Sequence, residues 1–252
     1  SFGPIVAGRL RAISWDYAFI AAAASIGMML LITIVFYREP EREYDRESLG
    51  DKLTGIVTVL ADRKFSLFLV LLGVFFWLPF WAFFNLCAIY VDANVDTAQL
   101  YLSMKGLLGE PFANFFSQVG EDGTRRVLGE TISHTGYIIM IFQIFVSGIL
   151  ERFKAMPAFL FGLFMMGVGF VVLGMAAVSS AALVFLGIFL FAVGEMISSP
   201  RIQEYITWIA PKEKAGLYMG TNFLAVGIGG ATSGVVYSTL SGYFAERSEE
   251  HT

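Results

Sequence analysis

The stretch that decides the fold is residues 131–178, which read TISHTGYIIMIFQIFVSGIL, then ERFK, then AMPAFLFGLFMMGVGFVVLGMAAV. Two apolar runs are separated here by a turn of four residues, three of which are charged. A helix that crosses a bilayer needs about 20 mostly apolar residues. The runs are continuously apolar, whereas the strands of a membrane β-barrel alternate between apolar and polar residues. The stretch therefore predicts two transmembrane helices joined by a tight turn.

The composition of the whole chain agrees with a membrane protein. Its 252 residues are 56% hydrophobic and only 15% charged, and the mean hydropathy is +0.68. Soluble domains are about 45–50% apolar and about 25% charged, so a disordered chain and a typical soluble enzyme are excluded. The net charge of −4 without a basic tract excludes a nucleic-acid binder. A single cysteine, Cys87, excludes a disulfide framework and a multi-cysteine metal site.

Stretches free of Asp, Glu, Lys and Arg predict six full membrane spans. The longest stretch is too long for one helix, and Ser179-Ser180 divides it into two spans. The uncharged stretches are 17–37, 65–91, 131–150, 155–194 and 215–245. We expect an all-α membrane protein that is an incomplete helical bundle, in which residues 1–10 end a further helix. Residues 247–252, RSEEHT, are expected to be a non-native tail.

Two long hydrophilic segments separate the spans. Residues 38–64 are dense in mixed charges and predict a solvated linker with a surface helix, and residues 101–116 of the second segment predict an interfacial helix. Ten Lys and Arg fall on the linker's side of the membrane and six on the other. Because cytoplasmic loops carry the excess of positive charge, we expect the linker to be cytoplasmic, in a bacterial inner membrane.

The turn between the third and fourth full spans carries a family resemblance. Gly148, Glu151, Arg152 and Lys154 resemble the signature turn of the major facilitator superfamily. The resemblance implies twelve helices in two halves of six. It assigns residues 1–37 to helices five and six, 38–64 to the cytoplasmic linker, and 65–246 to helices seven to eleven of the C-terminal bundle. Gly148, Glu151 and Arg152 would then be gating residues.

A closer resemblance is to the proton-coupled oligopeptide transporters within that superfamily. The matching segments are Phe76-Trp77, Tyr90 to Asp96, Gly194-Glu195, Ser199-Pro200, Ala210 to Lys212, Met219-Gly220 and Phe223-Leu224. The resemblance implies symport of small peptides or a related small polar solute, with a proton gradient as the driving force and no cofactor. It also implies that Glu195 meets the substrate amine. The chain departs from the family at Trp81 and Asn222, where the family has Glu or Gln and Trp.

Glu195 stands out physically as a carboxyl deep in an otherwise apolar span. A charge at mid-membrane costs about 2.5–3.5 kcal/mol on insertion scales. Glu195 must therefore face a polar cavity, pair with a cation or hold a proton. The alternative is a structural hydrogen bond between two helices.

Further candidates for the transport site lie inside the predicted spans. Trp77, Asn85, Gln143 and Asn222 are candidates to line a substrate cavity. The alternative for the amides is an interhelical hydrogen bond, and for Trp77 an interfacial anchor. Pro79 and Pro200 each remove a helix hydrogen bond, so either can be a gating hinge or a tolerated kink.

Two other function classes stay open. One is a non-transporting membrane receptor or scaffold with the same fold, and the other is a major facilitator carrier for a sugar, drug or organic ion. An intramembrane enzyme is not expected, because the sequence has no H-E-x-x-H, no G-x-S-x-G and only two His. The expected partners are the small-molecule or peptide substrate and the lipid bilayer, with no nucleic acid, no metal and no required oligomer.

Overall fold

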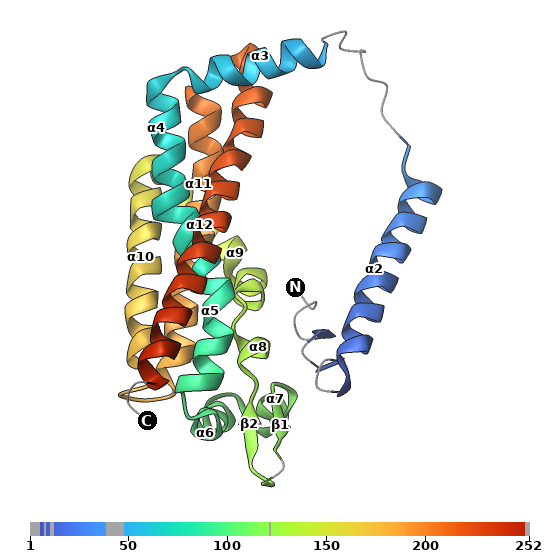
Figure 1. The fold of residues 1–252 in the computed structure, drawn as a ribbon, viewed down its shortest axis with the longest axis vertical. Helices are drawn as coiled ribbons and strands as arrows, with labels where there is room; N and C mark the ends of the chain where they lie inside the picture. Colours follow the sequence, from blue (N-terminus) through green and yellow to red (C-terminus); the bar gives the residue numbers. More distant parts are fainter. Residues whose placement is uncertain (1–5, 8, 11–12, 39–47, 121, 250–252) are drawn as a thin grey trace.

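The computed structural model in Figure 1 describes residues 6–7, 9–10, 13–38, 48–120 and 122–249, with the backbone alone for 240–249. The described elements are mostly helices, with one short pair of strands. The helices are α2 (Trp15–Phe36), α3 (Leu49–Leu60), α4 (Arg63–Leu72), η1 (Gly73–Trp77), α5 (Leu78–Asn94), α6 (Thr97–Leu108), α7 (Glu110–Phe115), α8 (Gly129–Ile132), α9 (Gly136–Leu150), α10 (Ala155–Met175), α11 (Leu183–Ile209), η2 (Lys212–Lys214) and α12 (Ala215–Glu249). The strands are β1 (Ser117–Val119) and β2 (Arg125–Val127).

Five helical segments in the described part of the chain are long and apolar enough to cross a membrane. They are Trp15–Phe36, Arg63–Asn94, Gly129–Leu150, Ala155–Met175 and Leu183–Ile209. They coincide with five of the six predicted spans, and the division at Ser179-Ser180 is confirmed because both residues lie between α10 and α11. The sixth predicted span, 215–245, forms the single helix α12 but is not among these five. The helix expected to end within residues 1–10 falls largely outside the described residues.

The helices form an upright bundle in which successive spans run in opposite directions (Figure 1). The helix α3 crosses one end, where Gly55 approaches Leu217 at the start of α12. The short elements α6, α7, β1 and β2 gather at the opposite end. The turns 151–154 and 210–214 lie at the α3 end, because α9 and α11 end there and α10 and α12 begin there. The two turns and residues 48–64 of the linker, each of which contains Lys or Arg, therefore share one end of the molecule.

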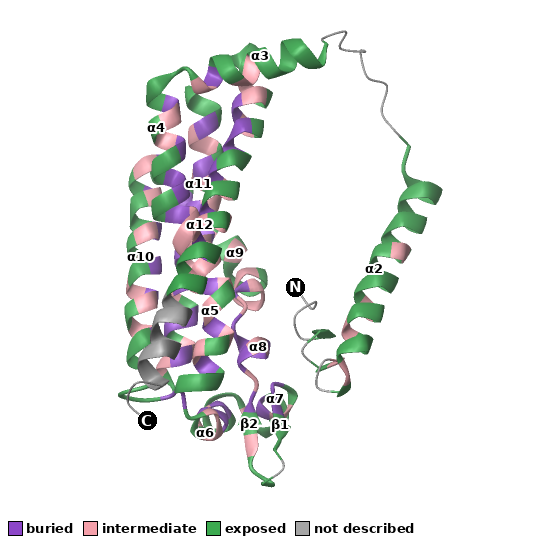
Figure 2. Ribbon diagram, in the orientation of Figure 1, coloured by how far each residue is buried: buried purple, intermediate pink, exposed green. Residues whose placement is uncertain are grey.

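The helix α2 lies beside the bundle rather than in it, and none of its residues is buried (Figures 1 and 2). A contact near its start joins it to the far end of the bundle. The Arg9 guanidinium donates hydrogen bonds to the carbonyl oxygens of Asn114, at 3.1 Å, and Phe115, and lies 5.2 Å from the centre of the Phe115 ring. Since these carbonyls lie at the end of α7, a cation there is also favoured by the helix dipole.

The centre of the bundle is α11, which carries the largest run of buried residues (Figure 2). Glycines let α10 approach it closely. A Cβ atom on Gly169 would lie 2.7 Å from the Phe191 nitrogen, and one on Gly187 would lie 2.8 Å from the Leu173 nitrogen. Small residues of this kind drive helix association in lipid because they allow extensive van der Waals contact. The α10–α11 pair is therefore the tightest part of the scaffold that holds Glu195.

The first span of the bundle is interrupted at its middle by the π-helical turn η1. The Leu78 N–H donates to the carbonyl of Gly73, five residues earlier. Pro79 follows at the start of α5, and it has no N–H to donate and crowds the preceding turn. The wider π turn accommodates the proline. Pro200, in contrast, lies inside the continuous helix α11.

The segment between α5 and α9 differs from its predicted form. The single interfacial helix expected at 101–116 is two helices, α6 and α7, because Gly109 adopts a φ of +87° between them and Pro111 restarts the chain. An unpredicted antiparallel hairpin follows, in which Ser117 pairs with Val127 and Val119 with Arg125. A small folded cap, formed by α6, α7 and the hairpin, therefore lies at the end of the bundle beside α5 and α8 (Figure 1).

Candidate functional site

Glu195 lies in the middle of α11 and is hydrogen-bonded to a buried threonine. The Thr135 hydroxyl donates to Glu195 Oε2 at 2.7 Å, and Thr135 is 2% exposed. Among the described spans, Glu195 is the one Asp or Glu more than two helical turns from an end. It lies about 18 Å from the start of α11 and about 21 Å from its end at 1.5 Å per residue. The predicted intramembrane acid is therefore half-buried near the mid-plane.

The bond to Thr135 suits both protonation states of Glu195. A hydroxyl is a donor and an acceptor, a carboxylate only accepts, and a carboxylic acid can also donate. The Thr135 side chain can thus donate to the charged form and accept from the neutral form without moving. This arrangement can hold a proton or release it while the residue stays in place.

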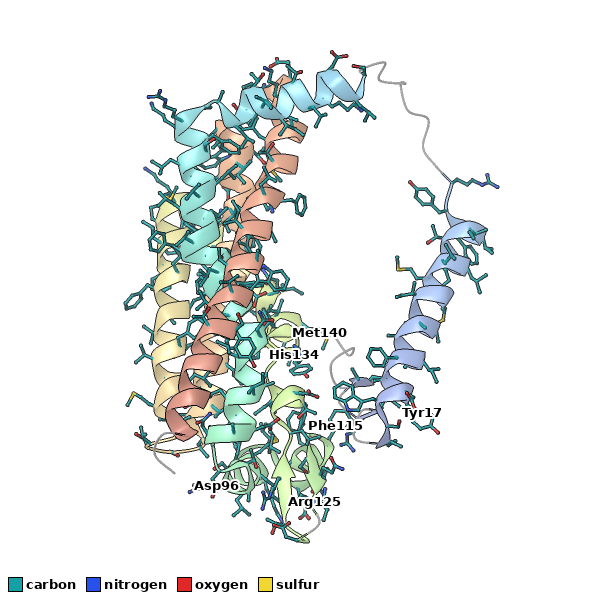
Figure 3. The ribbon with its side chains drawn as sticks, viewed as in Figure 1. Tyr17, Asp96, Phe115, Arg125, His134 and Met140 are labelled. Carbon is teal, nitrogen blue, oxygen red and sulfur yellow. The ribbon has the colours of Figure 1, made fainter. Side chains whose placement is uncertain are left out.

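His134, next to Thr135, joins this region to α5. Its ring lies 6.2 Å from the ring of Phe84 and nearly parallel to it, and Phe84 packs edge-on against Phe191 of α11. His134 is half-buried, because it directly follows the short helix α8, which packs against α5. Figure 3 shows His134 and Met140 on the side of the bundle that faces α2.

A second polar strip runs along α5 where that helix meets α12. Trp77, Trp81 and Asn85 are four residues apart and share one face. The Asn85 amide donates to Ser233 Oγ at 3.3 Å. A Cβ atom on Gly229 would lie 2.7 Å from the Trp77 carbonyl carbon, and one on Gly230 would lie 3.5 Å from Trp81 Nε1. Gly229 therefore lets α12 approach the backbone at Trp77, whereas a Cβ atom on Gly230 would make only an ordinary contact with the Trp81 indole.

Three buried polar atoms in the described residues have no hydrogen-bond partner: Trp77 Nε1, Trp81 Nε1 and Asn222 Oδ1. Asn222 is 1% exposed, on the face of α12 that is turned toward the bundle. Leaving a buried donor or acceptor unpaired costs about 1–3 kcal/mol. Two donors, on η1 and α5, and one acceptor, on α12, are thus left unpaired.

The remaining candidates are not gathered around Glu195. Gln143 donates to Ser147 Oγ, at 3.0 Å, on its own helix α9. Gly148, Glu151 and Arg152 are exposed at the α3 end of the bundle. The turn they form is held from α11 instead, since Arg201 donates to the carbonyl of Leu150 and to Glu204. Arg201 and Glu204, three residues apart on α11, form an ion pair.

The acids at the end of α5 have structural partners. Asp92 Oδ1 accepts from the N–H of Gly129 at 2.7 Å, and Asp96 Oδ1 accepts from the N–H groups of Ala98 and Gln99 at 3.0 Å. These bonds anchor α8 and begin α6. Within the described residues, no group of three or more His, Cys, Asp or Glu could hold a metal ion.

Thr135 and Ser233 are the site residues that the sequence did not single out. Each bonds to a residue at least 60 positions away, so neither contact follows from local spacing. The available signal for Thr135 is a hydroxyl at the start of a span, and for Ser233 a polar residue inside the glycine-rich face of α12. Both signals occur in many helices that only pack.

These features define a polytopic membrane protein with polar groups held between its spans. The family model of the Major Facilitator Superfamily matches residues 1–234, and the chain belongs to this superfamily. It is therefore an integral multi-pass membrane protein of a family of transporters. No curated protein and no solved structure matches the chain significantly.

Proposed function

We propose that the chain is part of a proton-coupled symporter for small peptides or a related small polar solute, in the oligopeptide-transporter branch of the superfamily. The observation that carries the proposal is the mid-membrane Glu195 bonded to Thr135. In this proposal residues 1–37 end the N-terminal bundle, 38–64 are the cytoplasmic linker, and 65–246 belong to the C-terminal bundle. The membrane is the bacterial inner membrane.

The proposed site divides the recognition of the solute between two regions. Glu195 holds either the coupling proton or the cationic amine of the solute, with Thr135 bonded to it in both cases. The unpaired indole N–H groups of Trp77 and Trp81 suit a carbonyl or carboxylate oxygen, and Asn222 Oδ1 suits an N–H group. Binding therefore replaces the unfavourable unpaired state of these atoms.

Alternating access is proposed to bend the span that contains η1 and Pro79. A π turn has weaker hydrogen bonding than an α-helix and often lies at functional sites. Interrupted helices border the substrate sites of many transporters. Trp77, which ends η1, would then move with the hinge.

The test is uptake into proteoliposomes by a carrier that contains these residues with the other helices implied by the family. Glu195→Gln is expected to abolish uptake driven by a proton gradient; it retains solute exchange at equilibrium if Glu195 holds the coupling proton and loses exchange if Glu195 holds the amine. Glu110→Gln is the matched control, since Glu110 is exposed on the cap and pairs with Lys105. Accumulation by Glu195→Gln at the normal rate would overturn the role of Glu195.

A carrier for another polar solute is favoured by two positions. Trp81 and Asn222 stand where the peptide transporters that the chain resembles carry Glu or Gln and Trp, which changes the side of the pocket away from Glu195. A substrate panel distinguishes the two solutes. Inhibition of uptake by amino acids or organic cations, without inhibition by dipeptides, would identify a carrier for another polar solute.

A further inference from the structure

An apolar groove opens between α9, α10 and α11, away from the polar groups of the transport site. Its volume is about 490 Å³. Val146, Ile149, Phe153, Pro157, Phe161 and Ile197 are among the residues that line it. Ile149, Phe153 and Phe161 are each more than half exposed, so the groove lies on the surface of the described bundle.

The groove ends at a charged turn. Arg152 and Lys154 flank Phe153 in the sequence, and both are exposed. Glu151 is exposed beside them, so the turn carries a net charge of +1. Arg201 and Glu204, the nearest charges on α11, are already paired with each other, and Arg201 also holds the Leu150 carbonyl. Arg152 and Lys154 are thus the cations at the mouth of the groove.

We propose that the groove binds an acyl chain of an anionic phospholipid whose phosphate lies between Arg152 and Lys154. The volume favours a lipid tail over a protein helix, since two turns of a helix about 10 Å across fill about 850 Å³. The lining is as apolar as lipid, so the tail gains little by leaving the bilayer. Selectivity therefore comes from the headgroup. Each Lys or Arg near an anionic headgroup raises the affinity about fivefold over that for an uncharged one.

The test is native mass spectrometry of the 252-residue chain in detergent, with equal amounts of phosphatidylglycerol and phosphatidylcholine of the same acyl chains. The chain is expected to retain phosphatidylglycerol at least fivefold more than phosphatidylcholine. Arg152→Gln with Lys154→Gln should bring phosphatidylglycerol down to the level of phosphatidylcholine. Lys212→Gln with Lys214→Gln is the control, because those lysines lie at the same end outside the groove.

A second pair of variants tests the groove itself. Val146→Trp fills it and should lower retention of both lipids at least fivefold. Ile144→Trp should leave retention unchanged, since Ile144 is 80% exposed on the same helix and does not line the groove. Equal retention of the two lipids, or equal effects of the two tryptophans, would overturn the proposal.

Discussion

Thr135 positions Glu195 across two helices, and its own place is fixed by burial. The side chain is 2% exposed at the start of α9, and its hydroxyl reaches Glu195 Oε2 at 2.7 Å. A hydrogen bond to a charged group contributes about 1.5–3 kcal/mol. Removal of the Thr135 hydroxyl therefore changes the balance between the two protonation states of Glu195 without touching the acid itself.

We predict that Thr135→Val lowers proton-driven uptake several-fold and displaces its pH profile. Valine keeps the shape of threonine and loses the bond to Glu195. Thr135→Ser keeps the hydroxyl, so it should restore both the rate and the profile. The measurement is initial uptake against pH for the three proteins. An unchanged profile in Thr135→Val would show that the hydroxyl only packs.

The linker helix α3 begins with a capping box that makes Asp51 sensitive to pH. Ser48 donates to Asp51 from its hydroxyl at 2.7 Å and from its N–H at 3.0 Å, which holds the pKa of Asp51 below its ordinary value. The charged carboxylate thus stabilises the start of α3 above a pH of about 3.9, the ordinary pKa of Asp. That stabilisation is lost as the pH falls through the lowered pKa.

We predict that Ser48→Ala raises the pKa of Asp51 toward its ordinary value. The measurement is a carboxyl carbon NMR titration of the native chain and the variant. Asp122 is the internal control, since its pKa is held low mainly by the Thr124 N–H and not by Ser48. A pKa of Asp51 that is the same in both proteins would contradict the assignment of the cap.

The sequence predicts the role of a single residue only where that role depends on residues close to it in the chain. The isolated acid in an apolar span and the Arg201–Glu204 pair follow from composition and a spacing of three residues. Thr135 could not be predicted, because its distance from Glu195 depends on how α9 packs against α11. The same holds for Asn85 and Ser233, which are 148 residues apart.

At the scale of elements, the contact between α10 and α11 depends on the absence of side chains. Gly169 and Gly187 face each other, and a Cβ atom on either would lie within 3.0 Å of the opposite backbone. Extra atoms in a well-packed contact cost about 1–3 kcal/mol. Gly167, on α10 two residues before Gly169, has open space where its Cβ atom would be.

We predict that Gly169→Ala destabilises the bundle by about 1–3 kcal/mol, since the new methyl group pushes α10 away from α11. Gly167→Ala is the matched control and should be neutral or slightly stabilising, because alanine favours the helix. The measurement is the unfolding midpoint in mixed micelles as sodium dodecyl sulfate is raised. Equal midpoints for the two variants would show that α10 and α11 do not pack through this face.

The spans were predictable and their interruptions were not. Charge-free length identifies the helices, because every residue of a span must be apolar or internally satisfied. The π turn η1 differs from an α-helical turn by one additional residue, and the sequence around it is as apolar as the rest of the span. Pro79 was therefore the only residue that indicated an interruption there. The hairpin had a stronger signal in Asp122-Gly123, a dipeptide typical of tight turns, but its strands are three residues long.

At the scale of the whole molecule, the charged connections make the two ends unequal. The α3 end carries residues 48–64 of the linker and the turns that contain Arg152, Lys154, Lys212 and Lys214. Cytoplasmic ends of membrane proteins carry this excess. The opposite end carries the cap of α6, α7 and the hairpin (Figure 1). The sequence predicted this asymmetry from loop charges, while the fold of the cap had to come from the structure.

We predict that a cysteine at Ser179 reacts with a membrane-impermeant maleimide from outside intact cells, and that a cysteine at Glu213 reacts only after permeabilisation. Both positions are exposed, in turns at opposite ends of the bundle. The background is low because Cys87, the only cysteine of the chain, is 2% exposed. The control is the unchanged chain, and the reverse labelling pattern would contradict the orientation.

The hairpin of the cap also offers a site at which a marker can be attached. The Gly120 N–H donates to the Thr124 carbonyl at 2.9 Å, and Gly123 makes the turn with a φ of +75°. Exposed loop tips of this kind tolerate insertions. An epitope or a small fused domain placed beside Gly123 would protrude from the cap end of the bundle (Figure 1). Single-particle images of a 27.8 kDa chain could then be aligned on that protrusion.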